Sequence, residues 1–202
     1  MSATYIYVCL IVIIACTVRY SSLFRRLECL IILHSSFYGM FVSISHQIIE
    51  KANASEKDGL LNIKGFYPET FDRILLDPPC SALGLRPRLS MITEGIEDLW
   101  KISEYQKKFV DNAVALLKGG GTMTYSTCTF NSSENEAMVS HILAQHPCME
   151  LVPIDIDFGL PGLSNKGLTE EQCQCVKRFD PSNESMDTMG FFVAKFVKRN
   201  CR

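Results

Sequence analysis

Apolar residues follow strand-like and helix-like spacings in turn along the last two-thirds of the chain. The run FDRILLD at 71–77 is nearly continuous in apolar residues, which predicts a buried strand. The prolines at 78–79 end it, because proline has no N–H to donate to a strand ladder. Residues 103–118 carry apolar side chains on one helical face, and the glycines at 119–121 are expected to terminate that helix.

The same alternation continues towards the carboxyl end. TMTYSTCT at 122–129 predicts a strand, and Ser133 and Glu136 have the spacing of a capping box that opens a helix ending at Pro147. The stretches MELVPIDI (149–156) and GFFVAKFVKR (190–199) supply two further strands. Strand, helix, strand, helix, strand is the order of an open, largely parallel α/β sheet with flanking helices.

The amino-terminal third has a different pattern. Residues 3–18 form an uncharged run that spans about 24 Å as a helix, a little short of the ~30 Å hydrocarbon core. Three interpretations stay open: a buried strand or accessory segment, a membrane-anchoring helix, or sequence foreign to the native fold. A polar stretch at 50–59 then leads to the division we expect, with residues 1–58 as an atypical hydrophobic segment and residues 60–202 as a separate part with alternating strands and helices.

Net charge and cysteine content bear on the binding partner, on metal binding and on the cellular compartment. A net charge of -2 does not suggest a strongly polyanion-binding chain, so contact with nucleic acid needs a local patch. The nine cysteines include no C-x-x-C pair with zinc spacing. Their odd number argues against a fully bridged secreted domain. We therefore expect reduced thiols, no metal, and a cytoplasmic or nuclear location.

Two of these cysteines come just after predicted neighbouring strands. Ligands of such sheets bind beyond the carboxyl ends of the strands, so Cys80 and Cys128 are expected to face the same crevice. Buried packing thiols are one interpretation, and a redox dithiol is a weaker one. The third is a nucleophile, which needs nearby positive potential; the helix predicted to start at Ser133 could provide it for Cys128.

The residues around both cysteines resemble a known family. LLDPPCSALG (75–84), YSTCTFNSSENE (125–136) and GFFVAKF (190–196) are similar to motifs of the Nop/Sun (RsmB-type) S-adenosylmethionine-dependent RNA cytosine-5 methyltransferases. The resemblance extends from about residue 63 to residue 199. Within the family, GLRPRL, RFDPS and GFFVAKFVK are most similar to the sixth Sun-domain member, which methylates a cytosine at the tRNA acceptor end.

The resemblance implies roles for named residues. It implies a Rossmann-like fold, S-adenosyl-L-methionine as cofactor, and RNA, with tRNA favoured, as substrate. It makes Cys128 the nucleophile that adds to C6 of cytosine and Cys80 the residue that assists release, whereas the Pro-Cys dipeptide of DNA cytosine-5 enzymes would select Cys80 as nucleophile. Asp77 would hydrogen-bond the base near N3 and, with Pro78 and Pro79, line the cofactor site.

Two arginines and two departures from the family pattern complete the site prediction. Arg86 and Arg88 are candidates for contacts with RNA phosphates. Pro78 stands where the family usually has alanine, and Ala82 where it usually has glycine.

The glycine-rich cofactor loop of the family has no counterpart in the sequence, which contains no D-x-C-A-A-P-G-G-K run. We therefore expect a truncated catalytic domain that is inactive unless other residues bind the cofactor. The alternatives are a non-catalytic RNA- or partner-binding remnant and a membrane-anchored truncated isoform that uses residues 3–18.

Overall fold

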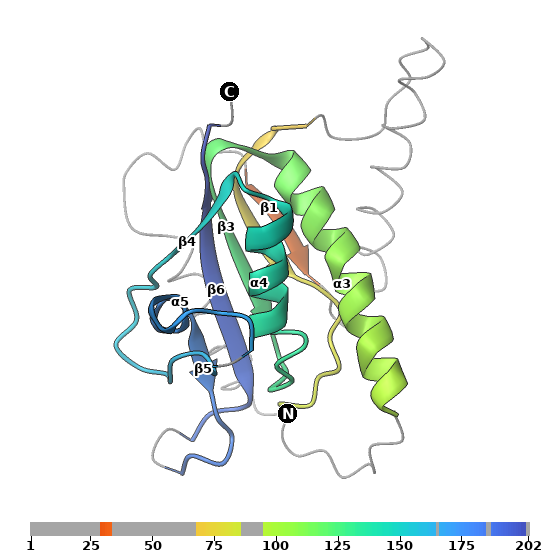
Figure 1. Ribbon diagram of the computed structural model, residues 1–202, viewed down its shortest axis with the longest axis vertical. Coiled ribbons are helices and arrows are strands. Elements are labelled where there is room, and N and C mark those ends of the chain that lie inside the picture. The colour runs from red at the N-terminus through yellow and green to blue at the C-terminus, as the bar shows by residue number, and fades with distance from the viewer. Residues whose placement is uncertain (1–28, 34–67, 86–94, 165, 185–186, 201–202) are drawn as a thin grey trace.

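The computed structural model describes residues 29–33, 68–85, 95–164, 166–184 and 187–200 (Figure 1). The proposed membrane segment at 3–18 and the candidate phosphate contacts Arg86 and Arg88 lie outside these ranges. Among the described residues, no helix combines the length and apolar character needed to cross a bilayer.

The described residues form one six-stranded sheet with three helices. The strands are β1 (Cys29–Leu33), β2 (Phe71–Asp77), β3 (Leu117–Thr127), β4 (Met149–Val152), β5 (Lys177–Phe179) and β6 (Phe191–Lys198). The helices are α3 (Ile96–Leu116), α4 (Glu136–Gln145) and α5 (Glu170–Cys175). Helices α3 and α4 lie side by side on the same face of the sheet (Figure 1).

The strand order is β1-β2-β3-β6-β4, and β5 also pairs with β6. Strands β1, β2 and β3 are parallel, and the sequence pattern predicted this for β2 and β3. Strand β6 runs antiparallel to β3, β4 and β5, so the sheet is mixed in its second half. Apolar periodicity reports which side chains are buried but carries no information on strand direction, which is why the predicted sheet is too uniformly parallel.

Strand β1 falls within the hydrophobic amino-terminal segment. Cys29–Leu33 aligns in parallel with the second strand, from Cys29 opposite Arg73 to Leu33 opposite Asp77. The run at 3–18, to which the three interpretations apply, lies outside the described residues.

The three glycines do not terminate the helix as predicted. Helix α3 ends at Leu116, and Leu117 already has extended backbone angles and is fully buried in the sheet. The glycines at 119–121 belong to β3, where the register with β2 shifts between Phe71 and Arg73. Gly120 has a φ of 80°, which glycine adopts without strain. The chain thus passes from the helix into the sheet at Leu117, before the glycines, which form an irregularity in the strand.

The predicted capping box of the next helix is also wrong. Helix α4 begins at Glu136, and its N-cap residue Asn135 makes no side-chain capping hydrogen bond. The Glu136 carboxylate binds Arg178 instead, at 2.7 Å. Glu136 thus forms an ion pair with an arginine outside the helix, and the local capping hydrogen bond is not made.

Both faces of the sheet are apolar. Ile74 and Leu76 point into a large cluster with α3 and α4, and Leu75 points to the other face, towards Phe191 and Val193. Alternating strand side chains point to opposite faces, so β2 is apolar throughout because both faces are covered. This burial fixes the strand ends that carry the two cysteines.

Candidate active site

The two cysteines predicted to share a crevice do so. Strands β2 and β3 are parallel neighbours, with Leu76 opposite Tyr125, so both end at the same edge of the sheet. Just beyond that edge, the Sγ atoms of Cys80 and Cys128 are 3.2 Å apart. Both thiols are half-buried and free. The separation fits an S–H···S hydrogen bond, and it places both sulfurs within reach of one pyrimidine ring.

The Cys80 thiol holds its proton tightly. Its hydrogen bond with Cys128 and its burial raise the pKa of Cys80 far above the ordinary thiol value, and a backbone hydrogen bond from Ala82 only partly opposes this. Either sulfur can donate the hydrogen bond between the two thiols. A protonated Cys80 can donate to a thiolate on its neighbour, which is what the roles implied by the resemblance require.

Asp77 ends β2 beside the two thiols. Burial raises its pKa to about 7, although a hydrogen bond from Ser126 Oγ to Asp77 Oδ1, 3.3 Å long, lowers it slightly. Near neutral pH a substantial fraction of Asp77 is therefore a neutral acid, which can donate a hydrogen bond. The N3 atom of cytosine is an acceptor, so this protonation state suits contact with the base.

Replacing Asp77 by asparagine tests the buried carboxyl. The unfolded chain loses this proton near the ordinary value of 3.8 and the folded chain near 7, so the native state binds more protons between these values and its stability falls as pH rises. Because the side chain keeps partial solvent access, we expect the wild type to lose about 1–3 kcal/mol relative to Asp77→Asn between about pH 4 and pH 8. Urea unfolding of both proteins measures the difference, and a pH-independent value contradicts the assignment.

A buried glutamate holds the loop that carries Cys80. Glu134 is fully buried and accepts hydrogen bonds from Ser81 N at 2.9 Å, Ser81 Oγ at 2.6 Å, Gln106 Nε2 at 2.9 Å and Asn131 Nδ2 at 3.0 Å. Gln106 Nε2 also donates to Pro79 O at 2.8 Å. Sequence reasoning used Glu134 only as part of a motif and missed this role, because the donors come from three separate segments.

The threonines flanking the second cysteine anchor its loop. Thr127 Oγ1 donates to Asn135 Oδ1 at 2.6 Å, and Asn135 Nδ2 donates to Thr129 O at 3.0 Å. Thr129 Oγ1 also hydrogen-bonds Ser81 Oγ at 2.9 Å. Both threonines are fully buried, whereas Cys128 between them is half-buried and packs against the cluster on the other face. Because successive side chains of an extended segment point to opposite sides, the Cys128 thiol points away from the side on which the two threonines make their hydrogen bonds.

Two glycines bring three segments together. Gly84 N donates to Cys128 O at 3.0 Å, and Gly190 N donates to Gly84 O at 2.9 Å. A Cβ atom on Gly84 would lie 2.0 Å from Gly190 O, so the backbones approach too closely for a side chain. Ala82 has a φ of 53°, in the left-handed region that favours glycine, which explains why the resembled family usually has glycine there.

The residues that the resemblance assigns to the cofactor site lie at the carboxyl end of β2. Leu33 is aligned with Asp77, so β1 ends beside β2 at the same edge of the sheet, and Asp77, Pro78 and Pro79 follow there. These three residues are the ones that the resemblance assigns to the cofactor site. Among the described residues, no group of histidine, cysteine and carboxylate side chains could hold a metal ion.

Comparison with known proteins finds a matching family model and similar sequences. The model of the family described as 16S rRNA methyltransferase RsmB/F matches residues 38–197. The chain is 47% identical over 143 residues to the rRNA (cytosine-C(5))-methyltransferase NOP2C of Arabidopsis thaliana, covering 66% of this chain and 24% of that protein. It is 39% identical over 155 residues to the human tRNA (cytosine(72)-C(5))-methyltransferase NSUN6, covering 66% of this chain and 33% of that protein.

Solved structures agree with these matches. The crystal structure of NSun6 from Pyrococcus horikoshii with SFG, an S-adenosylmethionine analogue, superposes with a TM-score of 0.59 at 27% identity, covering 86% of this chain and 48% of that one. A methyltransferase homologue from the same organism gives 0.54 at 28% identity, covering 76% and 50%. The chain thus spans a quarter to a third of the curated relatives named above and about half of the solved chains. With the family model matched over most of its length, the chain belongs to the RsmB/F family of methyltransferases.

Proposed function

We propose that this chain methylates C5 of a cytosine in RNA, with Cys128 as the nucleophile and S-adenosylmethionine as the methyl donor. The observation that carries the proposal is the 3.2 Å separation of the Cys80 and Cys128 sulfurs at the ends of adjacent parallel strands. C5 of cytosine is a poor nucleophile until a thiolate adds to C6. An arrangement that keeps one thiol protonated beside another therefore fits this chemistry.

The side chains divide the reaction between them. The Cys128 thiolate forms a bond to C6, and the displaced electron pair moves towards N3, where neutral Asp77 donates a hydrogen bond. S-adenosylmethionine, when bound, would supply the methyl group for C5 and leave as S-adenosylhomocysteine. A water molecule takes the proton from C5, the electron pair of that C–H bond re-forms the C5–C6 double bond, and the bond between C6 and Cys128 breaks with its electron pair on the Cys128 sulfur. Cys80, in contact with that sulfur, assists this release.

The favoured substrate is tRNA. The human relative and a solved archaeal relative are described as NSUN6 proteins, and the human one as acting on cytosine 72 of tRNA. Arg86 and Arg88 are the proposed phosphate contacts, because they follow directly after the loop that carries Cys80. A cytoplasmic or nuclear location is proposed because the reaction needs two reduced thiols.

Methyl transfer to RNA tests the proposal. The full chain is incubated with methyl-labelled S-adenosylmethionine and a tRNA transcript, and the label is located by nucleoside analysis. We expect label in 5-methylcytidine, and none with Cys128→Ala. Absence of cofactor binding at millimolar concentration would contradict the proposal, and RNA binding without label would favour the non-catalytic RNA-binding alternative.

A further inference from the structure

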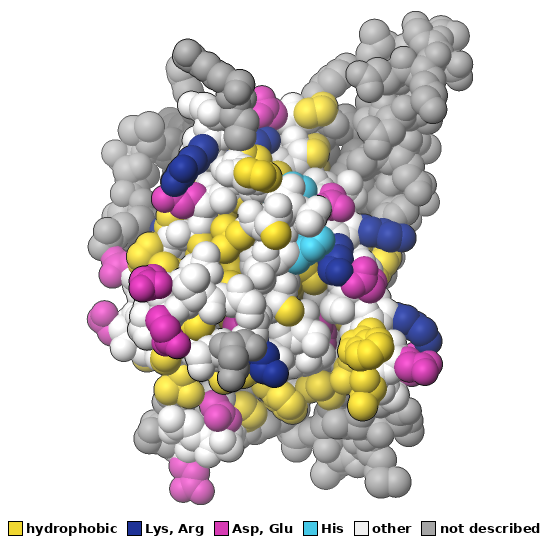
Figure 2. All heavy atoms as spheres, viewed as in Figure 1, with side chains coloured by type: hydrophobic (Ala, Val, Ile, Leu, Met, Phe, Trp, Pro, Cys, Tyr) yellow, Lys and Arg dark blue, Asp and Glu magenta, His cyan; other side chains and the backbone are white. Residues whose placement is uncertain are grey.

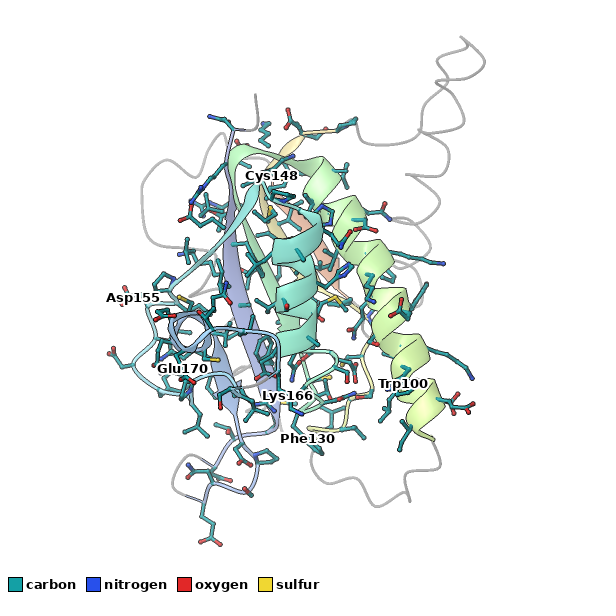
Figure 3. All side chains as sticks on the ribbon, viewed as in Figure 1. Trp100, Phe130, Cys148, Asp155, Lys166 and Glu170 are labelled. Atoms are coloured by element: carbon teal, nitrogen blue, oxygen red, sulfur yellow. The ribbon has the colours of Figure 1, made fainter. Side chains whose placement is uncertain are left out.

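A hollow that the proposed reaction leaves unassigned lies near the nucleophile. Its volume is about 520 Å³. It is lined by Phe130, Leu160, Pro161, Leu163, Arg178, Phe179, Asp180, Pro181 and Ser182. The last five of these are the RFDPS run noted in the sequence. Figure 3 places Phe130 at the lower end of the molecule, below α4, and Figure 2 shows hydrophobic side chains gathered along that lower edge.

Strand register sets the distance between the hollow and the thiols. Thr127, next to Cys128, lies opposite Phe192 of β6, and Phe192 lies opposite Arg178 of β5. Two strand spacings, roughly 10 Å, therefore separate the end of β3 from the wall formed by β5. Phe130 bridges this interval, since it follows Cys128 by two residues and lines the hollow. A nucleotide next to the target cytosine would lie at this wall.

The charged side chains that line the hollow already make hydrogen bonds within the protein. Arg178 Nη1 donates to both carboxylate oxygens of buried Glu136, at 2.7 and 2.8 Å, and Arg178 Nη2 donates to Phe130 O at 2.6 Å. Asp180 Oδ1 accepts hydrogen bonds from Ser182 N and Ser182 Oγ at 2.8 and 2.7 Å. With its one lining arginine neutralised and an aspartate beside it, the hollow offers little attraction for a phosphate.

The remaining surface is apolar and includes an exposed aromatic ring. The Phe130 side chain is 47% exposed, although the Arg178 contact fixes its backbone. Leu160 and Leu163 are also exposed large hydrophobic residues on the same wall. Unpaired bases of single-stranded RNA bind by stacking on aromatic side chains, which offer a flat apolar face.

We infer that this hollow binds the base of the nucleotide adjacent to the target cytosine, with Phe130 as the stacking platform. The inference rests on the proposed function, because it assumes that a target cytosine lies over the two thiols. An enzyme that acts on a base must draw that base out of its stack, which leaves the neighbouring base without a partner. Stacking on Phe130, close to the nucleophile, replaces the stacking contact that this neighbouring base loses.

The test compares two exposed phenylalanines. Phe158 is 48% exposed and is not among the residues that line the hollow, although its ring lies 5.5 Å from that of Phe179, so Phe158→Ala is a matched control for Phe130→Ala. Equilibrium binding of the full chain to a fluorescent single-stranded RNA is measured without cofactor. Three RNAs share one central cytosine: unmodified, abasic on its 5′ side, and abasic on its 3′ side.

We expect Phe130→Ala to weaken binding of the unmodified RNA by about 5- to 100-fold. Phe158→Ala should leave it unchanged, and one abasic RNA should bind the wild type and Phe130→Ala equally. Phe130→Leu, which keeps the wall apolar, should lose most of the same affinity. Equal binding by Phe130→Ala and wild type, or an equal loss on all three RNAs, would overturn the inference. Because no cofactor is present, the base-specific loss can appear even if methyl transfer fails, so the two proposals fail separately.

Discussion

Replacement of Cys128 by alanine is expected to reduce methyl transfer to RNA by on the order of 10⁴-fold or more, because no other group at that position can add to C6. The half-buried side chain is small, so the fold should survive. Covalent complexes with RNA that contains 5-fluorocytosine should disappear on denaturing gels. Cys148→Ala, at a partly buried thiol that packs beside the main core cluster, is the matched control and should keep wild-type trapping.

Cys80→Ala should behave in the opposite way. Its loss leaves addition to C6 possible but removes the thiol that contacts the Cys128 sulfur at 3.2 Å and assists release. We expect the covalent complex with unmodified cytosine RNA to accumulate, whereas wild type shows little. Accumulation with Cys128→Ala and none with Cys80→Ala would reverse the two assignments.

Glu134→Ala is expected to give the second largest effect, a loss of about 3–5 kcal/mol in the free energy of unfolding. The substitution strands the Ser81 N–H, the Ser81 hydroxyl and the amide groups of Gln106 and Asn131 in a buried region. Each unsatisfied buried donor costs about 1–3 kcal/mol, and partial relaxation reduces their sum. Urea unfolding curves measure the change.

The exposed Glu104 provides the control for this substitution. Its ion pair with Lys107 lies on the surface of α3, so Glu104→Ala should change stability by no more than about 0.5 kcal/mol. Covalent trapping should also fall in Glu134→Ala, because the loop that positions Cys80 loses its anchor. Stability and trapping both equal to those of Glu104→Ala would show that Glu134 does not hold the site together.

The meeting of the two thiols could be predicted because it depends on local signals and one general rule. FDRILLD and TMTYSTCT mark strands through their own residues, and parallel strands joined by a helix usually lie side by side. The strand over Phe71–Asp77 was predicted to the residue. The position of Cys80 and Cys128 just past the two strand ends then brought them to the same crevice.

The hydrogen bonds and close backbone contacts that hold the site in place could not be predicted, because they join residues distant in the sequence. Glu134 receives donors from 28 and 53 positions earlier in the chain, and the contact of Gly84 with Gly190 has no local signature. Helix α5 and strand β5 also went unpredicted, since six- and three-residue elements are too short for a periodic pattern. The antiparallel direction of β6 likewise depends on pairing with β3 and β4.

The most direct measurement of the central claim, that Cys128 forms the bond to cytosine while Cys80 stays free beside it, is peptide mapping of the trapped complex. The unaltered chain is reacted with 5-fluorocytosine RNA and S-adenosylmethionine, digested with protease and nuclease, and analysed by mass spectrometry. The account predicts a modified nucleotide on the peptide that contains Cys128 and an unmodified Cys80 peptide. A nucleotide attached to Cys80, with Cys128 free, would contradict it.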